Sequence, residues 1–295
     1  MPAARRNSNL FRTLTARIAV ALVVLLISGL PAATLVRMAP GFGLDERMLD
    51  ARLASSSLQA IERQGAEHSN VLAYYAQYLQ KLSRGDFGIS RSTGRPVREL
   101  LSERLALSLG SVVTGLGLAW TLALMVVTVL ELAHRSVNEV LASLVAGALL
   151  CTPAALVALA CVYIGATPAA AIAAIVFPRI FRYVRDVIRQ AGAAPHVLTA
   201  HALGLHPGRI LAFHVAPPVL PELFALAGIS VSMALGSMVP VEALCDSPGV
   251  GQLVWQAAMA RDLPVLVNVT LLLAAFTIMA NLLADTARSA REVQA

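Results

Sequence analysis

Long apolar stretches alternate with shorter polar ones along this chain of 295 residues. A helix needs about 20 consecutive apolar residues to cross the hydrocarbon core of a bilayer. The alternation predicts an all-α, polytopic membrane protein with about six transmembrane helices. These spans are expected at about Ile18 to Val36, Leu105 to Leu132, Val140 to Ile164, Ala169 to Val187, Val219 to Val241 and Pro264 to Ala284.

The composition supports a membrane protein. Hydrophobic residues make up 57% of the chain and charged residues 14%, whereas soluble domains carry about 25% charged residues. The formal net charge of +6 comes from arginines at the edges of the apolar stretches, so it requires no nucleic-acid partner. The composition therefore excludes a soluble domain and indicates an integral membrane protein.

The polar stretches divide the chain around these spans. The first span has an alternative interpretation as a signal peptide cleaved after Ala32-Ala33, because small residues there suit a signal peptidase. The apolar run is long for a signal peptide, which favours a retained helix. The expected parts are a cytoplasmic N-terminus at 1–17, the first transmembrane helix at 18–37, an external loop region at 38–99, a five-helix core at 100–288 and a tail at 289–295.

Basic residues that flank short loops remain on the cytoplasmic side, and this rule sets the orientation. If the six spans alternate, four basic regions fall on one side, which assigns both termini to the cytoplasm. The external region at 38–99 has mixed charge, which does not break the rule because long loops translocate largely regardless of charge. The four basic regions are Arg5 to Arg17, His134-Arg135, Arg179 to Arg209, and Arg288 with Arg291.

A row of arginines continues the fourth predicted span. Arg179, Arg182, Arg185 and Arg189 recur at spacings that place them on one helical face. A voltage sensor needs its arginines across the depth of the membrane, whereas these lie at the cytoplasmic end. They are expected to anchor the helix at lipid headgroups or to contact a cytoplasmic partner.

The polar segment from Thr199 to Pro217 has the pattern of a helical hairpin between two spans. Gly204 can adopt the left-handed conformation that ends a helix, and Pro207 suits the first turn of the next helix. Small alanines allow a close approach to another protein. The segment is therefore either a docking element for a cytoplasmic partner or an ordinary connection. The residues expected in the docking element are Ala200, Ala202, Leu203, Gly204, Leu205, Pro207, His214 and Pro217.

Several polar features are predicted on the external side. Gly85-Asp86 and Pro248-Gly249 are turn dipeptides, and the loops they shape either form a landing surface or only connect helices. Arg261 and Asp262 are adjacent and pair poorly with each other, so their partners are expected elsewhere. The external site residues are Gly85, Asp86, Phe87, Gly88, Glu242, Pro248, Gly249, Gly251, Arg261 and Asp262.

Glu242 lies at the external end of the predicted fifth span, where an ionisable residue is costly unless it is paired or hydrated. It could line a pore mouth, bond the end of a neighbouring helix, or face water at the interface. The local sequence does not choose among these three positions.

Catalytic and metal-binding motifs are not found in the sequence. A phosphate-binding P-loop needs a lysine after a glycine-rich turn, and the one lysine, Lys81, has no such turn before it. There is no HExxH motif for a zinc protease, and the three cysteines form no CxxC pair. The chain is therefore expected to be no enzyme and to bind no metal or cofactor, so an active transporter would use a partner ATPase.

Two sets of residues resemble a known family. The spacing from Thr199 to Pro217 resembles the EAA loop of ATP-binding cassette (ABC) importer permeases, which lies in a groove of the ATP-binding subunit. Further motifs are similar to those of the peptide and nickel permeases of the dipeptide and oligopeptide type. They are Gly85-Asp86-Phe87-Gly88, Glu242, Pro248-Gly249-Val250-Gly251, Arg261-Asp262 and Asn281 to Asp285.

The resemblance implies a type I ABC-importer permease in the bacterial inner membrane. It implies a second permease subunit, two ATP-binding subunits that hold ATP and magnesium, and an extracytoplasmic solute-binding protein. Short peptides are the first expected substrate, and nickel or another small solute the next. The alternatives are a channel or passive carrier, and an inactive permease-like scaffold. The chain departs from the family pattern at Thr199, where an acid is usual, and at His214, where an apolar residue is usual.

Overall fold

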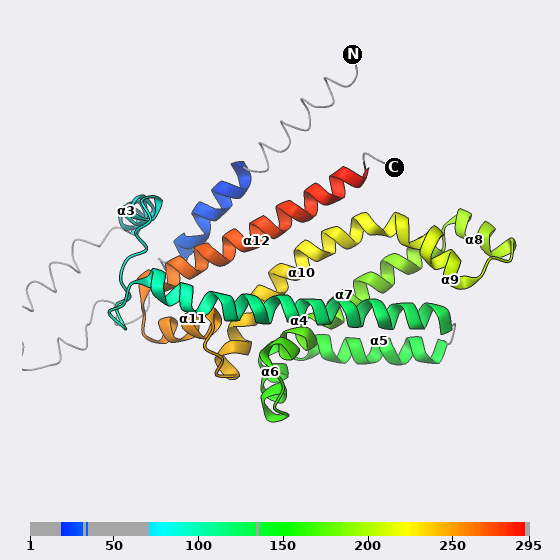
Figure 1. The fold of residues 1–295 in the computed structure, drawn as a ribbon, viewed down its shortest axis with the longest axis horizontal. Coiled ribbons are helices and arrows are strands. Elements are labelled where there is room, and N and C mark those ends of the chain that lie inside the picture. Colours follow the sequence, from blue (N-terminus) through cyan, green and yellow to red (C-terminus); the bar gives the residue numbers. More distant parts are fainter. Residues whose placement is uncertain (1–18, 32–33, 35–70, 134–135, 293–295) are drawn as a thin grey trace, which may run out of the picture. The chain divides into compact units, whose positions relative to one another are not determined.

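The computed structural model describes residues 19–31, 34, 71–133 and 136–292 (Figure 1). Within these ranges the chain forms helices and one isolated antiparallel bridge between Ile89 and Pro96. The predicted all-α fold is therefore confirmed. Several predicted features lie outside the described residues, namely the N-terminus at 1–17, the external segment from 38 to 70, the basic pair His134-Arg135 and the end of the tail.

The helices have the following bounds. An apolar helix covers Ala19–Pro31. The remaining elements are α3 (Val71–Ser83), α4 (Val97–Ala133), α5 (Ser136–Cys151), α6 (Ala154–Tyr163), α7 (Pro168–Gly192), α8 (Pro195–Ala202), α9 (Pro207–Ile210), a π-helical turn (Leu211–Val215), α10 (Ala216–Leu244), α11 (Val250–Met259) and α12 (Leu263–Glu292).

Three of the described helices are long and apolar enough to cross a membrane, namely Val97–Leu132, Pro207–Leu244 and Leu263–Thr286. They contain the second, fifth and sixth predicted spans. The fourth predicted span is also one continuous helix, α7. Its row of arginines makes α7 less apolar than the other three, so length and composition alone do not mark it as a span.

The third predicted span, Val140 to Ile164, is not one straight helix. It consists of α5 and α6, which are bent by 102° at the break between them. Pro153 lies at this break with an extended ψ of 138°, and a proline supplies no N–H to continue the helical ladder. With 16 and 10 residues, the two helices are about 24 and 15 Å long. Counted together, the pair raises the number of described spans to four at most.

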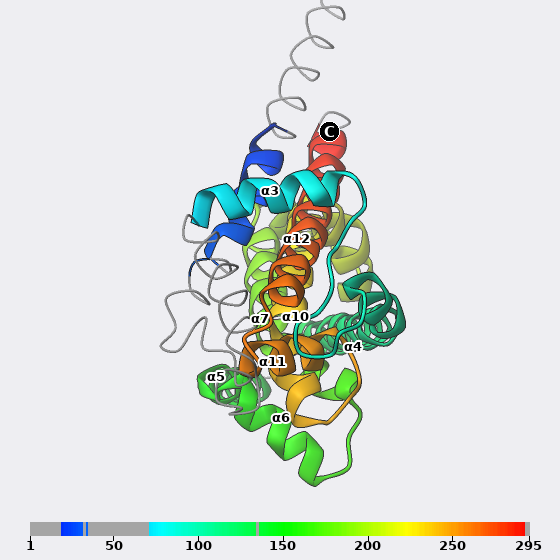
Figure 2. The ribbon, with the colours of Figure 1, turned by 90° about the vertical axis from the view of Figure 1, so that its left-hand side faces the viewer.

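Contacts between residues divide the chain into two compact units. Residues 1–103 and 253–275 form unit 1. In unit 1, Tyr75 and Tyr78 of α3 pack against the first three turns of α12 through Leu263, Val267 and Leu271, and α3 crosses α12 (Figure 2). The hydroxyl of Tyr75 also donates a hydrogen bond of 2.5 Å to the carbonyl of Leu26.

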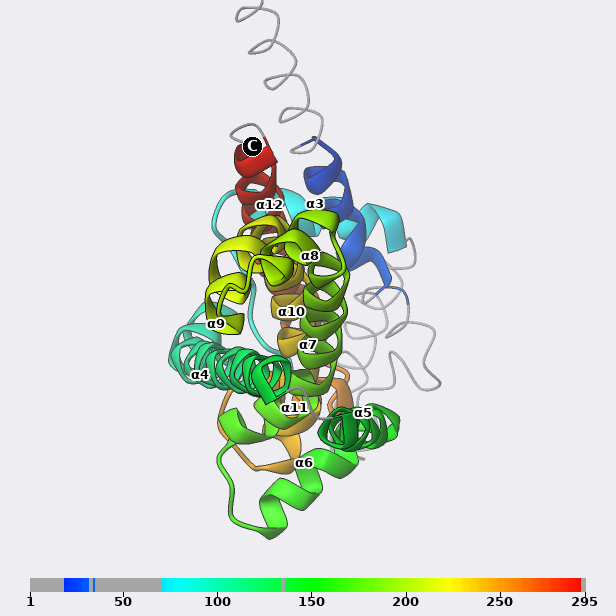
Figure 3. The ribbon, with the colours of Figure 1, turned by 90° about the vertical axis from the view of Figure 1, so that its right-hand side faces the viewer.

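Unit 2 consists of residues 104–252 and 276–295. Its central helix is α7, which packs against α5, α6 and α10, and α8 and α9 lie at one end of α7 and α10 (Figure 3). The buried face of α7 includes Ile180, Phe181 and Val184. The exposed arginines of α7 are Arg179, Arg182 and Arg189. Arg185 is half-buried and donates a hydrogen bond to the hydroxyl of Ser143 in α5.

Small residues bring helices of unit 2 close together. A Cβ atom on Gly115 of α4 would lie 2.7 Å from the carbonyl oxygen of Ala169 in α7. A Cβ atom on Gly228 of α10 would lie 2.6 Å from the Cβ of Ala284 in α12. Such close approach by small residues is typical of packed membrane helices, which associate without a hydrophobic driving force between them.

Candidate functional site

The loop between α7 and α10 contains the predicted docking element. Helix α8 begins with Pro195 in its first turn and ends at Ala202. After it, the N–H of Leu203 donates to the carbonyl of Thr199 and the N–H of Gly204 donates to that of His201, each over 3.0 Å. Gly204 has a φ of +72°, which confirms the predicted left-handed end of this helix.

The second helix of the hairpin, α9, begins at Pro207, as predicted. The residue before it, His206, caps this helix, because its Nδ1 accepts a hydrogen bond of 3.2 Å from the N–H of Gly208. Sequence reasoning missed this cap. A histidine directly before a proline at the start of a helix could have indicated it, although Ser, Thr, Asp and Asn are the usual caps.

One side of the hairpin is packed and the other is open. Val197 and Ala200 of α8 form a buried cluster with Ile210 and Val215. Ala202 and Gly204 are exposed, and Leu203 is 74% exposed although it is apolar. The loop is therefore a compact hairpin that presents an apolar tip.

A π-helical turn, Leu211–Val215, joins the hairpin to α10. Pro217 and Pro218 follow it, and a proline has no N–H to donate to a carbonyl in the preceding turn. The carbonyl of His214, which Pro218 cannot satisfy, instead accepts a hydrogen bond of 3.2 Å from Nε2 of His196. Within the described residues, the buried Nδ1 of His214 has no hydrogen-bond partner. Such π-turns are frequent at functional sites.

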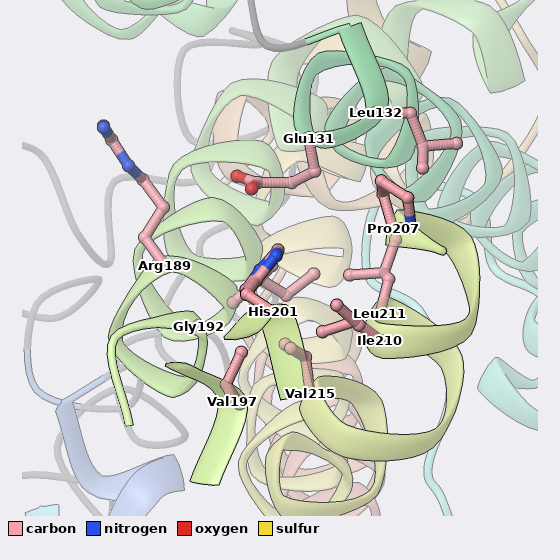
Figure 4. A pocket seen from close by; sticks show the side chains of 11 residues that line it. Glu131, Leu132, Arg189, Gly192, Val197, His201, Pro207, Ile210, Leu211 and Val215 are labelled. Carbon is pink, nitrogen blue, oxygen red and sulfur yellow. The ribbon is translucent and has the colours of Figure 1, made fainter. Parts of the chain in front are cut away.

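A cavity of about 210 Å³ lies behind this hairpin in unit 2 (Figure 4). Three polar side chains line it, those of Glu131, Arg189 and His201. The side chains of Glu131 and His201 lie among the other lining residues, whereas the guanidinium of Arg189 extends away from them (Figure 4). The apolar wall consists of Leu132, Ile188, Val197, Ile210, Leu211 and Val215. Sequence reasoning did not identify Glu131.

Asp262, one of the predicted external residues, bonds two serines of unit 1 that were not among the predicted site residues. This side chain is fully buried. One of its oxygens, Oδ2, accepts hydrogen bonds from the Ser90 hydroxyl at 2.6 Å, the Ser92 N–H at 3.0 Å and the Ser92 hydroxyl at 2.8 Å. The prediction that Asp262 has its partners elsewhere than Arg261 is thus confirmed. Arg261 is exposed and has a φ of +55°, which is uncommon for a residue other than glycine.

These hydrogen bonds set the protonation of Asp262. Burial by itself would raise the pKa of the carboxyl group, because it penalises the charged form. The bonds from Ser90 and Ser92 favour the carboxylate and outweigh burial, so the pKa of Asp262 lies below its ordinary value of 3.8. Asp262 is therefore a charged anchor for the loop that carries both serines.

The turn before this loop has the predicted geometry. Gly85 and Gly88 have φ values of +81° and +75°, and Asp86 Oδ1 accepts a hydrogen bond of 2.9 Å from the N–H of Gly88. The carbonyl of Phe87 accepts one of 2.7 Å from the side-chain nitrogen of Asn268 in α12. Residues 85–90 thus form a fixed turn in unit 1.

Glu242 is buried at the end of α10 and bonds the start of α11, which was one of the three positions left open. Its Oε2 accepts hydrogen bonds from the N–H of Gly251 at 2.7 Å and from the hydroxyl of Ser108 at 3.0 Å. The Ser108 oxygen in turn accepts one of 2.7 Å from the N–H of Val250. Because Glu242 has no exposed surface, the water-facing and pore-mouth positions are wrong for this structure.

Two glycines make room for this carboxylate. A Cβ on Gly249 would lie 2.1 Å from Glu242 Oε2, and one on Gly251 would lie 2.7 Å from the carbonyl of Met238. Pro248 before them is exposed. The predicted residues Glu242, Gly249 and Gly251 therefore belong to one tightly packed, hydrogen-bonded cluster in unit 2, the Glu242 cluster. The cluster also contains Ser108, a residue that sequence reasoning missed.

The described residues contain no group of three or more His, Cys, Asp or Glu side chains that could hold a metal ion. The hairpin, the turn at residues 85–90 and the Glu242 cluster are rigid parts of the structure. Oδ2 of Asp262 and Oε2 of Glu242 are held by hydrogen bonds within their own units, whereas the buried Oε1 of Glu242 has no hydrogen-bond partner among the described residues.

Comparison with known proteins identifies the family. The family model of the binding-protein-dependent transport system inner membrane component matches residues 115–290, which include α7, the hairpin and α10. The chain belongs to this family. It is accordingly a multi-pass membrane protein with a permease fold.

Individual relatives match over a shorter stretch. The di/tripeptide transport system permease protein DppB of Pseudomonas aeruginosa is 30% identical over 118 residues, which is 40% of this chain and 35% of the relative. The oligopeptide transport system permease protein AppB of Bacillus subtilis is 30% identical over 104 residues, 35% of this chain and 33% of the relative. The matches thus span about a third of the length of these curated relatives.

Proposed function

We propose that the chain is the membrane-spanning permease subunit of an ATP-driven ABC importer for a small solute. The observation that carries this proposal is the compact hairpin from α8 to the π-turn, which presents the exposed Leu203 beside the left-handed Gly204 in a member of the permease family. An exposed apolar tip on a packed base suits a groove in another protein. The buried cluster under the tip would transmit the ATP-driven movement of that protein to the membrane-spanning helices.

The proposed assembly has four kinds of subunit. This chain would pair with a second, similar permease, two ATP-binding subunits would hold ATP and magnesium, and an extracytoplasmic solute-binding protein would deliver the solute. The single lysine without a P-loop supports ATP hydrolysis by a partner. The role of this chain is then mechanical, with alternating access of the pore and no catalytic side chain.

Short peptides are the proposed substrates, and nickel or another small solute comes next. The support is the naming of the relatives as peptide permeases. The proposed orientation in the bacterial inner membrane places both termini in the cytoplasm. The turn at residues 85–90 and the exposed Pro248 and Arg261 would then face the binding protein.

Copurification tests the proposal. The tagged chain, isolated from its native membranes in mild detergent, is expected to bring down an ATP-binding protein, and Leu203→Glu is expected to lose it. Met259→Glu serves as the matched control, because Met259 is a similarly exposed apolar side chain, 71% against 74% for Leu203, and lies in α11 rather than in the hairpin. Equal recovery with both variants would contradict docking through the hairpin.

Flux measurements separate the alternatives. In proteoliposomes with the copurified subunits, an importer takes up solute only with ATP. Flux that does not depend on ATP would instead establish a channel or passive carrier. A stable assembly without flux of peptides or nickel would establish a scaffold.

A further inference from the structure

Three helices end at the cavity behind the hairpin. Glu131 and Leu132 lie in the last turn of α4, Gly192 is the last residue of α7, and His201 lies in the last turn of α8. The C-terminal end of a helix carries a partial negative charge from its carbonyl groups. Three such ends at one cavity make it a favourable environment for a cation.

Glu131 adds a full negative charge at the same place. An acid in the last turn of a helix is unfavourable, and α4 has no basic residue in that turn. Within the described part of the chain, Glu131 has neither a hydrogen bond nor an ion pair. A half-buried carboxylate that breaks a local rule, with no compensating contact among the described residues, is expected at functional sites.

The other polar groups at the cavity do not neutralise Glu131. Arg189 lines the cavity through its stem but directs its guanidinium away (Figure 4). His201 is exposed. The hairpin itself supplies no acid here, because Thr199 stands where the family usually has an acidic residue. The hydroxyl of Thr199 donates a hydrogen bond of 3.0 Å to the carbonyl of Pro195. Glu131 is therefore the acidic side chain that lines this cavity.

The rest of the cavity lining is apolar. Ile188, Ile210 and Leu211 line the cavity, and its volume of about 210 Å³ accepts a long side chain. Lysine and arginine combine an apolar stem with a cationic head, so they match both the wall and the carboxylate.

We propose that this cavity receives a lysine or arginine side chain of the ATP-binding subunit, with its stem on Ile188, Ile210 and Leu211 and its cationic head on Glu131. This inference rests on the proposed function and adds a second contact to it. The exposed tip at Leu203 would enter the partner, and the partner's basic side chain would enter this chain. The two contacts interlock, so the hairpin would follow the partner when it moves in either direction.

Binding measurements on the assembled permease test the inference. The permease pair is placed in lipid nanodiscs, and the ATP-binding subunit recovered by copurification is the probe. Glu131→Gln is expected to raise the dissociation constant about tenfold, and Glu131→Lys to raise it further, because like charges repel. The wild-type affinity is expected to fall as salt rises, with a weaker dependence in Glu131→Gln.

Glu222→Gln is the matched control, because Glu222 is an exposed acid of α10 that does not line the cavity. Unfolding midpoints of all variants check that each one folds. The inference is overturned if Glu131→Gln binds like the control, or if Glu131→Lys binds like wild type. If the wild-type permease binds no ATP-binding subunit, the proposed function fails first; if it binds one with no effect of Glu131, only the inference fails.

Discussion

Ser90 and Asp262 are joined by a hydrogen bond of 2.6 Å although they are 172 positions apart in the chain. Two further bonds from Ser92 reach the same carboxylate oxygen. The loop before α4 is thereby fixed to the turn before α12 within unit 1. A charge that is fully buried and held by three donors acts as an anchor, since removing either side leaves polar groups unpaired.

Asp262→Ala is expected to lower the free energy of unfolding by about 2–3 kcal/mol, because the donors on Ser90 and Ser92 lose their acceptor. Denaturation of the purified protein in mixed micelles measures this change. Asp86→Ala is the matched control, since Asp86 is an exposed aspartate that accepts one bond from Gly88. If the two variants lost equal stability, Asp262 would not be an anchor.

The same anchor predicts a dependence of stability on pH. The pKa of Asp262 is lower in the folded protein than its ordinary value of 3.8, so the folded state binds this proton less readily than the unfolded state. The stabilising contribution is then fully present above pH 3.8 and is lost as the pH falls through the lower folded pKa. Unfolding midpoints between about pH 6 and pH 2 are expected to fall less steeply for Asp262→Asn than for wild type. Parallel curves would contradict this assignment.

Features set by single residues could be predicted from the sequence. The left-handed Gly204, the helix that begins at Pro207 and the turn at Gly85 follow from the conformations that glycine and proline allow. The long apolar stretches likewise predict α4, α10 and α12, because an apolar stretch of about 20 residues is by itself enough to predict a membrane-spanning helix.

Features set by distant partners could not be predicted. Asp262 and Glu242 were recognised as charges that need partners, but nothing in the local pattern points to Ser90 or Ser108. The break at Pro153 was missed because the apolar pattern continues across it, and prolines are tolerated inside other helices of this chain, such as Pro178 in α7.

Gly249→Ala tests the packing of the Glu242 cluster. A new Cβ would lie 2.1 Å from Glu242 Oε2 and 2.5 Å from Ser108 Oγ, so the carboxylate must move and its bond to Gly251 is strained. A loss of about 1–3 kcal/mol in the free energy of unfolding is expected from such overpacking. Gly110→Ala, in helix α4 with no atom within 4 Å of the new Cβ, is expected to be neutral or stabilising by up to about 1 kcal/mol. Equal effects of the two substitutions would contradict the crowding.

Substitutions of Gly204 test backbone strain at the tip of the hairpin without adding steric crowding. Its φ is +72°, and a Cβ there would meet no atom within 4 Å, so any cost of a side chain comes from the left-handed backbone. Gly204→Ala is expected to cost about 1 kcal/mol in unfolding free energy, Gly204→Val more, and Gly204→Asn the least, because asparagine tolerates this conformation.

The control for this series is Gly236→Ala, which has equal room inside α10 but no positive φ and is expected to be neutral or stabilising. ATP-dependent uptake is measured on the same preparations. If the hairpin transmits movement from a partner, the uptake rate is highest in Gly204→Asn, lower in Gly204→Ala and lowest in Gly204→Val. The control stays at the wild-type rate. An unchanged rate across the series, with the expected losses of stability, would show that the tip conformation matters for folding and not for coupling.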